Sequence, residues 1–196
     1  MTRKIKRVII GISGSSGSIL GIRILEMLRS SNIETHLIMS QAARLTIREE
    51  TDWGIEQVNS LADVVHPITD IGATLASGSF TTIGMIVVPC SIKTLSAIAN
   101  SYADNLLTRA ADVTLKEGRP LILVVRETPL HFGHIRLMEI ATQAGAIIYP
   151  PVPSFYSRPQ TVDSIIDNIA GRILARMGIE NKHYHIWKGD RTNLGD

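Results

Sequence analysis

The chain has 196 residues, of which 44% are hydrophobic and 19% charged, and its formal net charge is +2. This length suits one α/β domain with a substantial core, and the small charge, carried by scattered basic residues, argues against a nucleic-acid-binding protein. The sequence has no apolar run of about 18 residues for a membrane span, no signal peptide, and a single cysteine, Cys90, as is usual in a reducing cytoplasm. We therefore expect a cytoplasmic protein that does not enter a membrane.

The first predicted element is a buried strand over Val8 to Ile12, followed by a glycine- and serine-rich loop and a helix over Ile19 to Ser30. This order places backbone N–H groups at a helix N-terminus, where they can bind a phosphate. Gly14 and Gly17 allow a ligand to approach the backbone closely, and hydroxyls come from Ser13, Ser15 and Ser16. An ordinary turn explains this stretch about equally well on its own.

The glycine spacing favours FMN over NAD. Gly11, Gly14 and Gly17 form G-x-x-G-x-x-G, which is neither the dinucleotide pattern G-x-G-x-x-G nor a P-loop. An NAD-binding fold also needs an acid at the end of its second strand. Here that strand, over Thr35 to Met39, ends at Ser40. A single phosphate with a small polar partner, as in FMN, fits these residues better.

The next helix, predicted over Gln41 to Glu50 with Ser40 as its N-cap, ends in two acids, Glu49 and Glu50. Acids are unfavourable at a helix C-terminus. Either the helix continues beyond Glu50, or a carboxylate is required at this place for function. Both interpretations remain open at this point.

Three further strands are predicted, and each ends in polar residues. They cover Met85 to Val88, Pro120 to Val125 and Ala146 to Tyr149. Helices are expected from Leu95 to Asn100, from Asp104 (a possible cap) to Lys116, from Pro129 to about Ala144, and from Thr161 to Met177. Gly178 ends the last helix, so we expect one domain over 1–178 and a C-terminal tail over 179–196.

Alternating strands and helices predict a Rossmann- or flavodoxin-like α/β fold, with three α/β/α layers and a mostly parallel sheet. Ligands bind at the carboxyl ends of the strands in such sheets. Polar residues follow each strand, namely Ser16, Ser40, Ser91 with Lys93, Arg126 with Glu127, and Tyr156. We expect these loops to form a pocket for a phosphorylated aromatic ligand and at least one further anion.

Five blocks of the sequence resemble the UbiX-type flavin prenyltransferases, formerly described as 3-octaprenyl-4-hydroxybenzoate carboxy-lyases. They are Gly11–Gly14, Pro89–Leu95, Asp104–Val113, Arg126–Leu130 and Pro150–Tyr156, within a resemblance over roughly Lys6 to Trp187. The resemblance implies an enzyme that joins a dimethylallyl group from dimethylallyl monophosphate to N5 and C6 of reduced FMN. It also implies a UbiD-type decarboxylase as recipient of the prenylated FMN, in ubiquinone biosynthesis or aromatic acid decarboxylation. A homo-oligomer, a dodecamer as in the family, would share its pocket between subunits.

The resemblance also assigns roles to individual residues. The FMN contacts are Gly14, Ser15, Ser16, Ser40, Ser91, Ile92, Lys93, Thr94 and Arg126. The allylic phosphate contacts are Lys116, Tyr156 and Arg172, with Arg109 close by. The catalytic residues are Ser16, Glu50, Glu127 and Lys116, and Trp187 loosely matches an aromatic near the prenyl pocket. Lys, Arg and Tyr donors suit a phosphate that gains charge as it leaves.

No D-D-x-x-D motif is present to hold magnesium, so the resemblance points to a reaction without a metal. The pairs His131/His134 and His183/His185 lack a cysteine or carboxylate at ligand spacing, which favours surface or packing roles. Two alternatives stay open. One is an FMN-dependent cysteine decarboxylase of the phosphopantothenoylcysteine type, although its P-x-M-N-x-x-M-W stretch is missing here. The other is a non-catalytic FMN carrier.

Overall fold

The computed structural model describes residues 6–187 and 189. Its centre is a six-stranded sheet in the order β3-β2-β1-β4-β5-β6, with every neighbouring pair parallel. The strands are β1 (Lys6–Ile12), β2 (Ile33–Met39), β3 (Val64–His66), β4 (Met85–Cys90), β5 (Leu121–Val125) and β6 (Ile147–Ile148). The predicted α/β class and the parallel sheet are confirmed.

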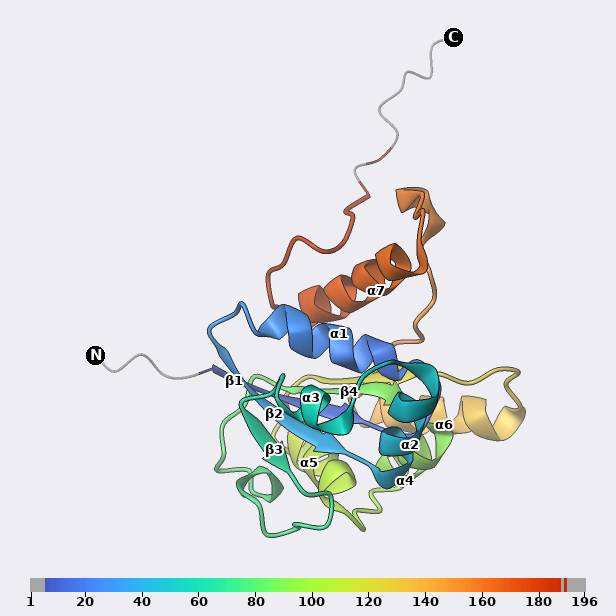
Figure 1. Cartoon of the computed structure of the whole chain (residues 1–196). Coiled ribbons are helices and arrows are strands. Elements are labelled where there is room, and N and C mark those ends of the chain that lie inside the picture. Colours follow the sequence, from blue (N-terminus) through green and yellow to red (C-terminus); the bar gives the residue numbers. More distant parts are fainter. Residues whose placement is uncertain (1–5, 188, 190–196) are drawn as a thin grey trace.

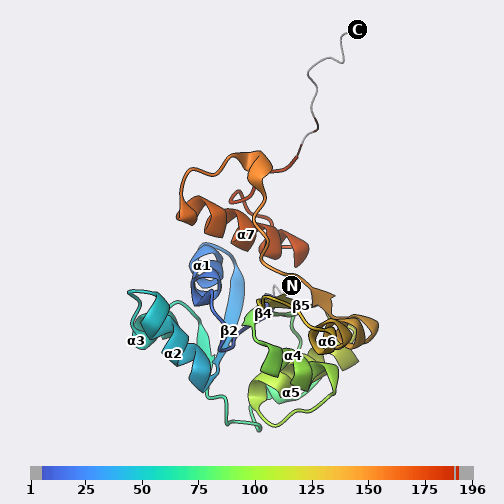
Figure 2. The same cartoon turned by 90° about the vertical axis from the view of Figure 1, so that its right-hand side faces the viewer.

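Helices cover both faces of the sheet, as Figures 1 and 2 show. One face carries α1 (Ser18–Leu28), α2 (Gln41–Glu50), α3 (Ile55–Asn59) and α7 (Val162–Arg176). The other carries α4 (Ile92–Ala99), α5 (Leu106–Lys116) and α6 (Phe132–Gln143), with the short 3-10 helix η1 (Thr74–Ala76) beside α5. A second 3-10 helix, η2 (Phe155–Ser157), precedes α7. None of the described helices is long and apolar enough to cross a membrane.

From Val8 to Ile12, strand β1 is apolar because this part contributes to two cores. Val8, Ile10 and Ile12 pack with α1 and α7, whereas Ile9 packs with α4 and α5. Successive side chains of a strand point to opposite faces, and both faces of this sheet are covered by helices. This is why the sequence shows a continuous run rather than an alternation of polar and apolar residues.

A crevice is expected where β1 and β4 lie side by side, because the chain continues from β1 toward β2 and from β4 toward β5, in opposite directions. The loops that follow these two strands are tied together by Ser13. Its hydroxyl donates to the carbonyl of Pro89 at 2.9 Å and accepts from the N–H of Ser91 at 2.7 Å. Ser13 is buried. Its hydroxyl therefore holds the two loops in register instead of facing a ligand, which corrects the expectation from the sequence.

Three helix starts differ from their predicted positions. Helix α4 begins at Ile92 rather than Leu95, because the Ser91 side chain accepts from the N–H of Thr94 and caps the helix there. Helix α6 begins at Phe132 rather than Pro129, because Nδ1 of His131 accepts from the N–H of Gly133 and caps the helix there. Helix α5 is capped by Asn105 rather than Asp104, since the Asn105 side chain accepts from the N–H of Thr108 at 3.1 Å. The predicted boundary between the domain and the C-terminal tail, after residue 178, remains a prediction. Just beyond it Ile179 is buried, so the start of the tail packs on the domain.

Candidate functional site

The N-terminus of α1 is occupied by a carboxylate. Oε2 of Glu50 accepts from the N–H of Gly17 at 2.9 Å, from the N–H of Ser18 at 3.4 Å and from the Ser18 hydroxyl at 3.3 Å. An acid at the end of α2 is thus favourable because it lies against the positive end of α1. Helix α2 does not continue past Glu50. The expectation of free N–H groups at this helix end is therefore wrong for the described structure.

The loop between β1 and α1 fits closely against α2. A Cβ at Gly14 would lie 2.3 Å from the Cβ of Ala42, so only glycine fits there. Gly17 has a φ of 98°, a conformation that glycine adopts without strain. The Ser15 hydroxyl is buried and has no hydrogen-bond partner among the described residues. Because a buried hydroxyl is normally paired, Ser15 is a fitting donor for a ligand phosphate.

Ser40 and Ser91 both cap helices at the same edge of the sheet. Ser40 Oγ accepts from the N–H of Ala43 at 3.0 Å, and Ser91 Oγ accepts from the N–H of Thr94 at 3.3 Å. The Ser91 hydroxyl also donates to Oγ1 of Thr94 at 3.1 Å. Helices α2 and α4 therefore begin at the carboxyl ends of the strands, where the positive end of a helix favours a phosphate. Helix α1 begins at the same end of the sheet, with its N-terminus against Glu50.

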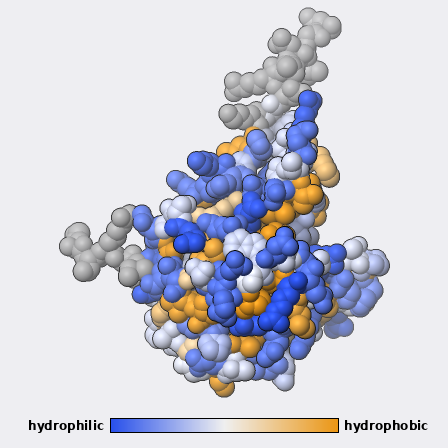
Figure 3. All heavy atoms as spheres, in the orientation of Figure 1, coloured by the Kyte–Doolittle hydropathy of each residue, from blue (hydrophilic) through white to orange (hydrophobic). Residues whose placement is uncertain are grey.

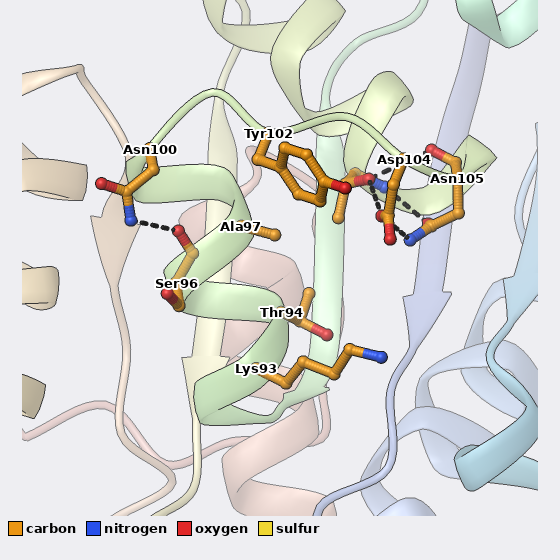
Figure 4. Close-up of a pocket in the computed structure, with 9 residues that line it drawn as sticks. Lys93, Thr94, Ser96, Ala97, Asn100, Tyr102, Asp104 and Asn105 are labelled. Carbon is orange, nitrogen blue, oxygen red and sulfur yellow. Dashed lines mark hydrogen bonds between the residues drawn. The ribbon is translucent and has the colours of Figure 1, made fainter.

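A cavity of about 530 Å³ lies beside Lys93 and Thr94. Figure 4 shows these two side chains on α4, with Tyr102, Asp104 and Asn105 on the loop that leads into α5. Lys93 and the Tyr102 ring reach in the same direction, toward the side where Asp104 lies. An exposed aromatic ring beside amide and carboxylate groups suits a planar heteroaromatic ligand. The sequence prediction named Lys93 and Thr94 but missed Tyr102, whose position after α4 gave no signal.

Arg126 and Glu127 follow β5 at this same edge and are exposed. The N–H of Arg126 donates to the carbonyl of Cys90 at 3.3 Å, which places this pair next to the loop after β4. Oε1 of Glu127 accepts from the N–H of Thr128 at 3.0 Å.

Burial raises the pKa of the Cys90 thiol. Cys90 is therefore a core residue and not a nucleophile.

A second group of predicted residues gathers around α7 and η2. The Tyr156 hydroxyl donates to the carbonyl of His185 at 2.9 Å, and its ring meets the Trp187 ring edge-on with centroids 5.5 Å apart. Burial raises the pKa of Tyr149, and the nearby positive charge of Arg172 opposes that rise. Helix η2, drawn in orange, lies beyond α7 on the side away from the sheet (Figures 1 and 2). Tyr156 thus contacts Trp187, and both Tyr156 and Arg172 lie close to Tyr149.

The remaining predicted phosphate contacts lie on α5. Arg109 donates from Nε to the carbonyl of Ala76 at 3.3 Å and from Nη1 to Oδ2 of Asp112 at 2.8 Å. Lys116 donates to Oε1 of Glu117 at 2.5 Å, which lowers the pKa of that carboxyl. Helix α5 ends at Lys116, just before β5 begins. Lys116 therefore lies near the amino ends of the strands, whereas Ser16 follows the carboxyl end of β1. A single site with both residues therefore requires more than one copy of the chain.

Within residues 6–187 and 189, no group of three or more His, Cys, Asp or Glu side chains is arranged to hold a metal ion. The rings of His131 and His134 pack together with centroids 3.6 Å apart, and His131 caps α6. His183 lies in the tail, where its N–H donates to Oδ1 of Asn181 at 3.1 Å. The contacts of His131 and His183 are those of packing and capping residues.

Comparison with known proteins agrees with this geometry. The flavoprotein family model matches residues 1–174. A flavin prenyltransferase UbiX from Escherichia coli K12 is 59% identical over 175 residues, covering 89% of this chain and 93% of its own. The crystal structure of AnUbiX (PadA1) in complex with FMN and dimethylallyl pyrophosphate is 47% identical with a TM-score of 0.93, covering 95% and 99% of the two chains. A dodecameric FMN-dependent UbiX-like decarboxylase from Escherichia coli O157:H7 is 46% identical with a TM-score of 0.91, covering 93% and 100%.

Proposed function

This chain belongs to the flavoprotein family, with UbiX flavin prenyltransferases among its relatives, and we propose that it joins a dimethylallyl group to N5 and C6 of reduced FMN. The observation that carries the proposal is the division of anion-binding groups into separate sets. The loops after β1, β2 and β4 suit the flavin phosphate, with the buried Ser15 hydroxyl as a donor. Arg172 and Tyr156 suit a second phosphate. A simple FMN carrier has no need of the second set.

The chemistry assigns a role to each set. Lys116, Tyr156 and Arg172 donate to the allylic phosphate and stabilise the charge that grows on it as the C–O bond breaks. The aromatic rings of Tyr156 and Trp187 provide a surface that tolerates an allylic cation. Reduced FMN supplies the N5 and C6 atoms that receive the group. Glu50, or the Ser16 hydroxyl, then moves protons at those two atoms.

An anaerobic assay tests this proposal. The protein, reduced FMN and dimethylallyl monophosphate are combined, and the flavin is analysed by mass spectrometry. We expect a prenylated flavin, formed equally well with a chelator present, because no magnesium motif is found in the sequence. Dimethylallyl pyrophosphate is offered in parallel, since AnUbiX was crystallised with it. An unchanged flavin mass with both donors contradicts the proposal.

We further propose a homo-oligomer, with a dodecamer as the expected size because one relative is dodecameric. Large apolar side chains reach the surface of this subunit, including Leu130, Phe132, Ile135, Val152, Phe155, Val162 and Trp187, and Figure 3 shows orange patches among polar residues on one face. Such patches favour burial between copies. The distance of Lys116 from Ser16 within one subunit supports a site that a partner copy completes.

A mixing experiment tests the shared site. Glu50→Gln and Lys116→Ala are each expected to abolish most turnover. If Glu50 and Lys116 reach one site from different copies, co-assembled oligomers of the two variants contain some sites with both native residues. We therefore expect activity to return on co-assembly, while each variant alone stays inactive. Light scattering that shows an active monomer contradicts the shared site.

The prenylated FMN would serve a UbiD-type decarboxylase, in ubiquinone biosynthesis or aromatic acid decarboxylation. We propose a cytoplasmic location for this transfer. The cysteine decarboxylase alternative is not favoured, because the close relatives are named flavin prenyltransferases.

A further inference from the structure

A row of charged and polar side chains runs across β1, β2 and β3, from Arg7 near the start of β1 to His66 at the end of β3. Nε of Arg7 donates to Oε1 of Glu34 at 2.7 Å. Nε2 of His36 lies 2.9 Å from the same oxygen, and Nδ1 of His36 lies 2.9 Å from Nε2 of His66. The two imidazole rings are stacked, with centroids 5.2 Å apart. His36 is only 3% exposed, so its hydrogen bonds are made inside the protein.

Hydrogen bonding from Arg7, and then from His36, lowers the pKa of Glu34, so its carboxylate is ionised and only accepts. Nε2 of His36 therefore carries the proton that faces Glu34. Burial, and then the neighbouring His36, lower the pKa of His66. The 2.9 Å contact between Nδ1 of His36 and Nε2 of His66 continues the row of hydrogen bonds from Arg7 to His66.

These residues hold both ends of the segment from Pro67 to Phe80. His66 ends β3 and immediately precedes the segment. At the other end, the Phe80 ring meets His36 edge-on at 5.1 Å, and the guanidinium of Arg7 lies over it at 4.9 Å. The segment is therefore fixed to β1 and β2 by His66 at one end and by Phe80 at the other.

The same segment contacts three cations, Arg109 in the first turn of α5, Lys116 at its end and Arg119 just beyond it. The carbonyl of Ala76 accepts from Arg109 at 3.3 Å. The carbonyls of Gly78 and Phe80 accept from Arg119 at 2.7 and 2.8 Å. A Cβ at Gly78 would lie 2.9 Å from Nζ of Lys116, so the ammonium group packs directly against this glycine. The segment is thus in contact with both Arg109 and Lys116.

We propose that His36 and His66 are positioning residues for the phosphate-binding cations Arg109 and Lys116, and that they act through the segment Pro67–Phe80. The inference rests on the proposed function, because it takes Arg109 and Lys116 as contacts of the allylic phosphate. Neither histidine touches a substrate. Their effect is on the binding of the prenyl donor and not on that of FMN.

The test compares two substitutions at one position. His66→Phe keeps a ring for stacking and removes the nitrogen that hydrogen-bonds to His36. His66→Gln places a side-chain amide, which can both donate and accept, near the former Nε2 and can restore that hydrogen bond. We expect His66→Phe to raise the KM for dimethylallyl monophosphate about three- to tenfold with a smaller change in kcat, as the loss of one hydrogen bond allows. We expect His66→Gln to restore the KM to within about twofold, and FMN affinity to be unchanged in both.

A second readout does not depend on turnover. Hydrogen exchange of the amides in residues 67–80 should accelerate in His66→Phe and return toward the wild-type rate in His66→Gln. Equal behaviour of the two variants, in KM or in exchange, overturns the inference, as does an equal loss of FMN affinity. If the wild-type protein forms no prenylated flavin, the proposed function fails instead, and the exchange rates alone decide whether the histidine pair fixes the segment.

Discussion

Replacing Arg172 by alanine should lower kcat/KM for dimethylallyl monophosphate roughly ten- to a hundredfold and leave FMN affinity unchanged. A charge-assisted hydrogen bond to a phosphate contributes about 1.5–3 kcal/mol, and about 1.4 kcal/mol corresponds to a tenfold change in rate. Arg172 is exposed on α7 and lies near Tyr149 and Tyr156, whereas the expected flavin phosphate site is at the loop Gly14–Ser16. The two ligands should therefore respond differently to this change.

The measurement is steady-state prenyl transfer together with fluorescence titration of FMN. Arg176→Ala provides the matched control, because Arg176 carries the same charge one turn further along α7 and is also exposed. We expect a change of less than about twofold for the control, as is usual for exposed positions without a specific contact. Equal losses of affinity for FMN and for the prenyl donor in Arg172→Ala would show that the two ligands do not occupy separate sites.

The elements with strong local signals were predictable from the sequence. Five of the strands follow from apolar runs that end in polar or small residues, and the cap at Ser40 is a local pattern. The edge strand β3 was harder to predict, because it has only three residues and is partly exposed. The start of α6 was missed because the signal at His131 is a side-chain cap two residues beyond the proline.

The long-range contacts were not predictable, because they depend on residues far apart in the chain. Glu50 ends α2, and only the packing of α2 beside α1 explains why an acid is favourable there. The hydroxyl of Ser13 looks like a ligand group in the sequence, yet it bonds to Pro89 and Ser91. Lys116 has the right chemistry for a phosphate, but its place at the end of α5, far from Ser16, depends on how the whole chain folds. This distance is why we propose that two copies of the chain share one site.

Glu50 caps α1, and we propose that the same carboxylate also acts as a base. As a cap, it satisfies the N–H of Gly17 and interacts with the positive end of the helix, which contributes about 0.3–1 kcal/mol to stability. As a base, it can accept a proton released at the flavin. The first role needs an oxygen acceptor at this position, while the second needs a carboxylate that can be protonated. Glutamine supplies the acceptor but not the base.

Glu50→Gln should therefore fold, bind both ligands and stall during prenyl transfer. Loss of a general base lowers the rate about a hundred- to ten-thousandfold. We expect a flavin adduct with the full prenylated mass, formed through the carbon–nitrogen bond at N5, whose fourth ring remains open, and NMR of the extracted flavin distinguishes it from the closed product. Glu49→Gln is the matched control, since it removes the same charge from the neighbouring exposed residue and should leave the rate within about twofold of wild type. Full turnover by Glu50→Gln, together with a lowered melting temperature, would show that this carboxylate only caps α1 and that the proton passes to another group, such as the released phosphate.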